Sequence, residues 1–289
     1  MCEHDDFGGF AARSPKLTRR KFGVMALGAG LAAALPRLAY ASDTKATDVD
    51  IKTPDGAADA FFVQPAKGKH PGILIWPDIM GLRPAFKEMA TRLAECGYSV
   101  LVVNPFYRTK RAPTAPEHVD FKDKPTVDAL MALKDTLNAD TALTDAKAFV
   151  SFLDAQASVD KKRKIGTTGY CMGGPLVMRT AAAIPARIGA GATFHGGGLV
   201  TDKPDSPHLL IPQMKAQFLI AIAENDDAKE PTAKNTLRDA FAKAKLPAEI
   251  EVYAGTQHGW CPTDSPIYNH DQAEKAWSRL LALFSSALA

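Results

Sequence analysis

The chain has 289 residues, 23% of them charged, and a formal net charge of +3 at neutral pH. Residues 1–41 carry six Lys or Arg and three Asp or Glu, out of 35 and 32 in the whole chain, so residues 42–289 alone have no net charge. Phosphate binding depends on clustered Lys and Arg, so this balance and the absence of a basic stripe argue against nucleic acid as a partner.

The N-terminal segment predicts export. Arg19 and Arg20 precede an uncharged run at 22–35, which is shorter than the roughly 20 residues of a membrane-spanning helix. The Ala-Tyr-Ala triplet at 39–41 resembles a signal-peptidase site, and paired arginines are typical of a twin-arginine signal. A chance basic N-terminus on a cytosolic protein is the alternative. We expect a signal peptide at 1–41 and a periplasmic or secreted protein with no stable membrane anchor after cleavage.

The remaining residues, 42–289, have a length that a single α/β domain often has. Alternating polar and apolar residues around the turn at 54–56 predict a hairpin. Short continuous apolar runs, typical of buried strands, then alternate with segments of helical periodicity. The expected strands are 72–76, 99–103, 164–169, 188–194, 217–223 and 249–253, and the expected helices are 84–96, 142–153, the segment after Cys171, 231–244 and 273–284. This order predicts a doubly wound α/β fold, in which helices cover both faces of a mostly parallel sheet.

One segment, from Asn104 to about Lys134, does not follow this alternation. It contains four prolines, mixed charges and no sustained period. A long irregular loop in a compact domain is either a lid or substrate-shaping loop, or a mobile surface insertion.

A Gly-x-Cys-x-Gly pattern occupies the turn between an expected strand and an expected helix. Gly169 and Gly173 flank Cys171, as in a nucleophile elbow, where a tight turn exposes the reactive side chain. The helix N-terminus behind the turn favours the thiolate over the thiol. The alternative for Cys171 is a small buried apolar residue.

A cysteine nucleophile needs a base, and the base needs an orienting acid. The strand 217–223 leads into Glu-Asn-Asp-Asp, and the strand 249–253 leads to His258. Nucleophile, acid and histidine thus follow in the order typical of α/β-hydrolases, each after a strand. Asp226 is favoured as the acid, with Asp227 as the alternative.

Other histidines and cysteines have weaker contexts. His195 follows a further strand end and is expected in a turn that lines the pocket, with direct substrate contact as the alternative. Cys96 and Cys261 could form a disulfide bridge, whereas Cys261 alone would be a small buried residue. Outside the residues already named, no closely spaced His, Cys, Asp or Glu set indicates a metal site, and no cofactor is expected.

The segments "WPDIMGL", "GYCMGG", "ENDD" and "QHGW" resemble the dienelactone hydrolase family of α/β-hydrolases, from about Val49 to the C-terminal helix. The resemblance implies the α/β-hydrolase fold and hydrolysis of a small ester or lactone by a triad of Cys171, Asp226 and His258. It also implies an oxyanion hole formed by the backbone N–H groups of Ile79 and Met172.

Two positions depart from the family pattern. Asp78 stands where family members acting on dienelactone carry a glutamate that partners the cysteine, and could either hold the thiol proton or cap the following helix. Arg108 matches one of two arginines that bind the substrate carboxylate, but Trp260 and its neighbours after His258 include no second arginine. Asp78, Arg108, His195 and Trp260 are the residues expected around the substrate.

Two other functions fit the same residues. One is a general carboxylesterase or thioesterase that acts on acyclic esters. The other is a non-catalytic thiol-redox or ligand-binding protein, although the sequence contains no Cys-x-x-Cys motif to supply a resolving thiol.

Overall fold

The computed structural model describes residues 43–289. The predicted signal peptide at 1–41 lies outside the described residues. Within 43–289, none of the helices combines the length and the apolar character that crossing a bilayer requires.

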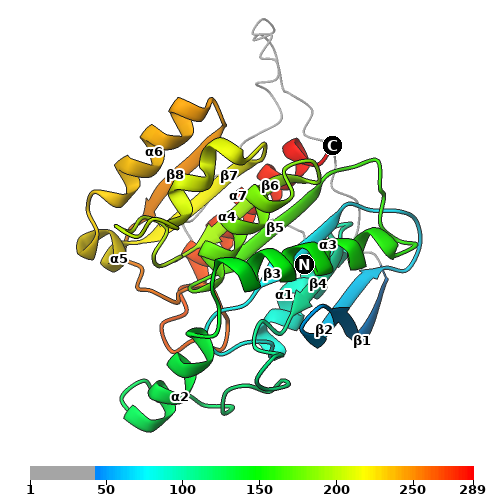
Figure 1. Ribbon diagram of the computed structural model, residues 1–289, viewed down its shortest axis with the longest axis horizontal. Coiled ribbons are helices and arrows are strands. Elements are labelled where there is room, and N and C mark those ends of the chain that lie inside the picture. The colour runs from blue at the N-terminus through cyan, green and yellow to red at the C-terminus, as the bar shows by residue number, and fades with distance from the viewer. Residues whose placement is uncertain (1–42) are drawn as a thin grey trace, which may run out of the picture.

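The described chain forms an eight-stranded sheet (Figure 1). Its strands are β1 (Thr44–Thr53), β2 (Gly56–Pro65), β3 (Gly72–Trp76), β4 (Ser99–Val103), β5 (Ile165–Tyr170), β6 (Ile188–Phe194), β7 (Gln217–Ala223) and β8 (Ala248–Tyr253). The strand order is β1-β2-β4-β3-β5-β6-β7-β8; β1 and β2 pair antiparallel, β2 and β4 pair antiparallel, and every other neighbouring pair is parallel. The prediction of a mostly parallel sheet is confirmed.

Helices cover both faces of this sheet, as predicted (Figure 1). They are α1 (Pro84–Glu95), α2 (Lys124–Lys134), α3 (Ala139–Ala155), α4 (Gly173–Ala183), α5 (Glu224–Lys229), α6 (Ala233–Ala244) and α7 (His270–Ala287), with a 3-10 helix η1 at Pro207–Gln213. α1 and α7 pack on one face, and α3, α4 and α6 on the other.

The two faces have separate apolar cores because successive side chains of a strand point in opposite directions. In β3, Leu74 and Trp76 belong to the core under α3 and α4, while Ile73 and Ile75 belong to the core under α1 and α7. Both sides of the central strands are therefore buried, which explains why these strands are continuous apolar runs.

The segment 104–134 is more ordered than expected. Its last third is helix α2, with the Asp123 carboxylate accepting a hydrogen bond from the Thr126 N–H and Pro125 in the first turn. The prediction of an irregular loop up to Lys134 was wrong there, because a proline in the first helical turn starts a helix rather than breaking one. The sequence also did not predict α5 and η1 as helices.

Candidate active site

The turn between β5 and α4 has the geometry of a nucleophile elbow. Cys171 lies between these elements with a φ of 53°, in the left-handed region that side chains other than glycine rarely adopt. A Cβ at Gly169 would lie 2.3 Å from the Gly173 carbonyl oxygen, and a Cβ at Gly173 would lie 2.4 Å from the Trp76 carbonyl oxygen. The turn is thus tight enough to require glycine on both sides of the cysteine.

His258 follows β8 and is hydrogen-bonded to a carboxylate that follows β7. Its Nδ1 lies 2.7 Å from Asp226 Oδ2, and its backbone N–H donates to the Asn225 side-chain oxygen at 2.9 Å. The neighbouring Asp227 instead binds the Lys234 ammonium at 2.5 Å. Of the two acids left open by the sequence, Asp226 is therefore the one beside the imidazole.

The Cys171 side chain is close enough to His258 to affect its titration. Burial lowers the pKa of His258, but the hydrogen bond to Asp226 and the interaction with Cys171 outweigh burial and raise this pKa to about 10. The geometry thus favours an imidazolium between a carboxylate and a sulfur atom.

An apolar surface surrounds the sulfur. Phe106 after β4, Leu133 of α2 and Met172 form a buried cluster, against which Ile79 and Cys171 pack. We call these five residues the Cys171 cluster. Within residues 43–289, neither the Ile79 nor the Met172 backbone N–H donates to another protein group. Both N–H groups are therefore free to bind another acceptor, and their role as oxyanion donors stays a prediction.

Asp78, expected beside the substrate, is held by Arg83. The guanidinium forms two hydrogen bonds to the Asp78 carboxylate, at 2.6 and 2.9 Å, and two more to Asp264, at 2.6 and 3.0 Å. Asp78 also accepts from the Met80 N–H at 2.9 Å. Helix α1 has Arg83 at its N-cap, so of the two alternatives for Asp78 the capping of this helix is not observed, and holding the thiol proton stays a prediction. The Asp78 carboxylate instead holds the loop that carries Ile79 in place.

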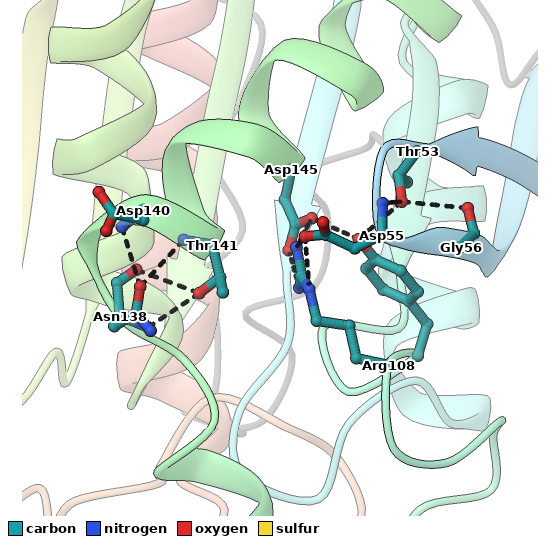
Figure 2. Close-up of polar contacts among 9 residues, drawn as sticks. Thr53, Asp55, Gly56, Arg108, Asn138, Asp140, Thr141 and Asp145 are labelled. Carbon is teal, nitrogen blue, oxygen red and sulfur yellow. Dashed lines mark hydrogen bonds and ion pairs between the residues drawn. The ribbon is translucent and has the colours of Figure 1, made fainter.

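Arg108, expected to bind a substrate carboxylate, is engaged within the protein (Figure 2). Its guanidinium donates two hydrogen bonds to Asp145 of α3, at 2.9 and 2.7 Å, and two to Asp55 of the β1–β2 turn, at 2.9 and 2.6 Å. The Tyr107 hydroxyl donates to the same Asp145 at 2.8 Å. Four of the five guanidinium N–H groups are thus satisfied internally. The assignment of Arg108 to the substrate pocket is corrected to a link between the hairpin and α3.

His195 and Trp260 are close to His258 but are not accessible to a substrate. Only 1% of the His195 surface and none of the Trp260 surface is exposed. The His195 ring lies 5.0 Å from the His258 ring and 5.2 Å from the Trp260 ring, centroid to centroid. The expectation that these two residues lie around the substrate is corrected, because both are buried and Trp260 packs against His195, which in turn contacts His258.

Sequence reasoning missed several residues of the site. Leu133 could have been found from its helical spacing to Leu130, both of them buried on α2. Asn225 stands in the quoted "ENDD" segment, but nothing in that pattern assigns its amide to the His258 backbone. The ion pairs of Arg83 have no sequence signal, because Asp264 is 181 residues away.

Two further predictions from the sequence concern a disulfide bridge between Cys96 and Cys261 and a metal site. Cys261 has a free thiol, so the bridge between these two residues is not formed. Burial raises the pKa of the Cys261 thiol well above its ordinary value. Among residues 43–289, no group of three His, Cys, Asp or Glu side chains is arranged to hold a metal ion.

With this geometry established, a model of the dienelactone hydrolase family matches residues 58–288. The chain belongs to the dienelactone hydrolase family. It is therefore a hydrolase of this family with an α/β-hydrolase fold, as its resemblance implied.

Individual relatives agree with this membership. A carboxymethylenebutenolidase from Rhodococcus opacus is 25% identical over 224 residues, which cover 76% of this chain and 83% of that protein. A Synechocystis protein that carries the same enzyme name by inference is 25% identical over 250 residues, covering 85% of this chain and 98% of its own. A crystal structure of an inferred dienelactone hydrolase from Klebsiella pneumoniae has a TM-score of 0.73 at 22% identity, covering 85% of this chain and all of that one, and supports the fold.

Proposed function

We propose that this protein hydrolyses a carboxylic ester or lactone through a covalent thioester on Cys171. The observation that carries this proposal is the arrangement of Cys171, His258 and Asp226 after three different strands, with His258 hydrogen-bonded to Asp226 and its pKa raised by Cys171. Family membership supports ester hydrolysis as the reaction class.

The proposed reaction has two steps. The Cys171 thiolate attacks the carbonyl carbon, and the N–H groups of Ile79 and Met172 bind the resulting oxyanion. The His258 imidazolium protonates the leaving oxygen as the carbon–oxygen bond breaks and the thioester remains. His258, now neutral, takes a proton from water, which attacks the thioester and releases the acid and Cys171. Asp226 holds the imidazole in the orientation that both steps need.

A second candidate is a general carboxylesterase acting on acyclic, uncharged esters. The Cys171 cluster favours it, because Phe106, Leu133 and Met172 present hydrocarbon next to the sulfur. Arg108 also favours it, because its guanidinium is already paired with two carboxylates. Rates on p-nitrophenyl esters and on enol lactones with and without a carboxylate distinguish the two candidates. A thiol-redox function gains no support from Cys261, which is buried in the core under α1 and α7.

The test of the proposed function is substitution of the nucleophile. We expect Cys171→Ala to lower kcat at least about 10³-fold on every ester that the wild type cleaves, while circular dichroism and melting temperature stay unchanged. Mass spectrometry of wild type trapped with a slowly hydrolysed ester should place the acyl group on Cys171. Full hydrolysis by the alanine variant, or an acyl group on another residue, would contradict the proposal.

We further propose that the mature protein is periplasmic or secreted and acts on a small-molecule substrate there. The support is the paired Arg19 and Arg20 ahead of a short apolar run.

A further inference from the structure

His195 is a buried polar residue that the proposed reaction does not use. It is 1% exposed, and neither ring nitrogen has a hydrogen-bonding partner among residues 43–289. Its backbone has a φ of 42°, in the left-handed region where His is among the more tolerated residues. Because neither nitrogen forms a hydrogen bond, any effect of this ring on the site must come from the residues that it packs against.

The ring of His195 is fixed by its surroundings. Its backbone N–H donates to the Ala221 carbonyl of β7 at 2.8 Å. The ring then meets Trp260 at 5.2 Å, Tyr170 of β5 at 6.1 Å and His258 at 5.0 Å, with the His258 contact edge to face at 66°. His195 is thus hydrogen-bonded to the sheet through its backbone and contacts His258 with its ring. This contact limits how far the His258 ring can rotate.

This restriction matters because the hydrogen bonds of His258 depend on ring orientation. In the proposed reaction one ring nitrogen must face Cys171 while Nδ1 keeps its bond to Asp226, and a ring nitrogen bonds close to the ring plane. About a third of the His258 side chain is exposed, so the ring has solvent to turn into. The contact with His195 lies on the protein side of the ring and opposes this rotation.

His195 can fill this position because it carries no charge. Burial, and secondarily the nearby His258, lower the pKa of His195 well below its ordinary value. The titratable groups that face it are His258 from the loop after β8 and Tyr170 from β5, while Asp226 and Cys171 face His258. A second positive charge at this distance would oppose the imidazolium form of His258.

We propose that His195 is a positioning residue, whose neutral ring holds the His258 imidazole in line with Cys171 and Asp226. This inference rests on the proposed function for its consequence in catalysis. The contact itself is expected to control how the His258 ring faces Cys171, whether or not the right ester has been found.

Two substitutions distinguish the effect of the His195 ring from the effect of its nitrogens. His195→Asn removes the ring and keeps a residue that tolerates the left-handed backbone, whereas His195→Phe keeps a flat ring and removes both nitrogens. His270→Asn is the matched control, because His270 is exposed at the first position of α7. If His195→Asn does not fold, His195→Gln replaces it as the variant without a ring.

The first readout is turnover of a p-nitrophenyl ester. We expect His195→Asn to lower kcat by about 10- to 100-fold with KM within about threefold, because misplacing a catalytic group by about 1 Å can cost 100-fold. The kcat of His195→Phe should stay within about threefold of the wild-type value, and the kcat of His270→Asn should equal the wild-type value.

The second readout needs no substrate. Iodoacetamide labelling of Cys171 at pH 7, followed by mass spectrometry of its peptide, reports how reactive the sulfur is beside His258. In His195→Asn the labelling rate should fall about tenfold, because a displaced imidazole no longer activates the sulfur. A purely structural role would lower the melting temperature without changing this rate.

The outcomes are distinguishable. A folded His195→Asn variant with wild-type kcat and wild-type labelling overturns the inference, as does a His195→Phe variant that loses as much as the asparagine variant. If wild type cleaves no ester in the panel, the proposed function fails. Slower labelling of Cys171 that is confined to the variants without a ring would still support positioning by His195.

Discussion

At the scale of single residues, we expect His258 to determine the pH range in which the proposed site works. Burial lowers the pKa of His258, but the interactions with Asp226 and Cys171 outweigh it and raise this pKa to about 10, with the Asp226 hydrogen bond as the largest contribution in that direction. The ordinary value is 6.5. The imidazolium form therefore persists through neutral pH and is lost as the pH rises through about 10.

Asp226→Asn removes the carboxylate and should bring the pKa of His258 down by at least about one unit. Since the proposed reaction protonates the leaving oxygen with the imidazolium, we expect the alkaline fall of kcat/KM near pH 10 to move to lower pH in this variant. NMR titration of the His258 ring measures the shift directly. Asp227→Asn is the matched control, because Asp227 pairs with Lys234 instead, and an equal shift in both variants would refute the assignment.

The same pKa makes a prediction about stability. A folded-state pKa above the unfolded value contributes stability that is complete below about pH 6.5 and disappears as the pH rises towards 10. The free energy of unfolding of the wild type should thus fall over this interval more steeply than that of Asp226→Asn. Urea unfolding at several pH values measures both slopes.

At the scale of elements and loops, Arg83 connects the loop after β3 to the loop after β8. Its partners Asp78 and Asp264 lie on these two loops, and Asp78 precedes Ile79 directly. Arg83 and Asp78 are largely buried, with side chains 11% and 9% exposed, so removing one partner leaves an uncompensated charge. The link fixes a predicted oxyanion donor relative to the loop that carries His258.

Arg83→Met should lower the free energy of unfolding by about 3 kcal/mol. It should also lower kcat about tenfold, because losing an oxyanion donor completely costs 100-fold or more. The double variant Arg83→Met with Asp78→Asn should recover part of the lost stability in urea unfolding. Arg111→Met is the control, since Arg111 pairs with Asp50 in solvent, and no measurable change is expected there. Equal losses of stability and kcat in Arg83→Met and Arg111→Met would count against a specific role for Arg83.

Helix α2 contributes to the site through one face. Leu133 is buried in the Cys171 cluster, whereas Met131 of the same helix is exposed. We expect Leu133→Ala to lower the free energy of unfolding by about 2 kcal/mol and to raise KM for apolar esters about tenfold. Met131→Ala should change neither quantity. A Leu133→Ala variant with unchanged KM would show that α2 does not shape the substrate site.

At the scale of the whole molecule, the topology of the sheet assembles the site. β3, β5, β6, β7 and β8 are parallel neighbours, so the residues that follow them emerge at one edge. Ile79, Cys171, His195, Asp226 and His258 each follow one of these strands. Residues more than 170 positions apart thereby become neighbours, although their order along the chain alone does not bring them together.

The proposed export is also tested on the whole chain. Replacing Arg19 and Arg20 by Lys keeps the charge but should block twin-arginine transport, leaving an uncleaved precursor in the cytosol of a bacterial host. Cell fractionation and mass spectrometry of the N-terminus measure this, and wild type should begin at Ser42. The control is Lys16→Arg, which should not affect transport. Export of the double variant at the wild-type level would contradict the twin-arginine prediction.

The sequence by itself determined the strands, most of the helices and the three residues of the proposed triad. It could do so because buried parallel strands are continuous apolar runs, and because Gly169 and Gly173 are the residues that a tight turn requires. These are local properties, so a single chain displays them. Helix α2 was not predicted, because a proline such as Pro125 indicates a helix break unless its place in the first helical turn is known.

The tertiary structure alone decided which polar side chains are free to act. Arg108 and Asp78 belong to types that bind substrates, but each forms ion pairs with residues that the fold brings beside it. His195 and Trp260 follow strand ends, as binding residues often do, yet both are enclosed behind His258. Burial and charge pairing depend on contacts between distant segments, and no local pattern in the chain records those contacts.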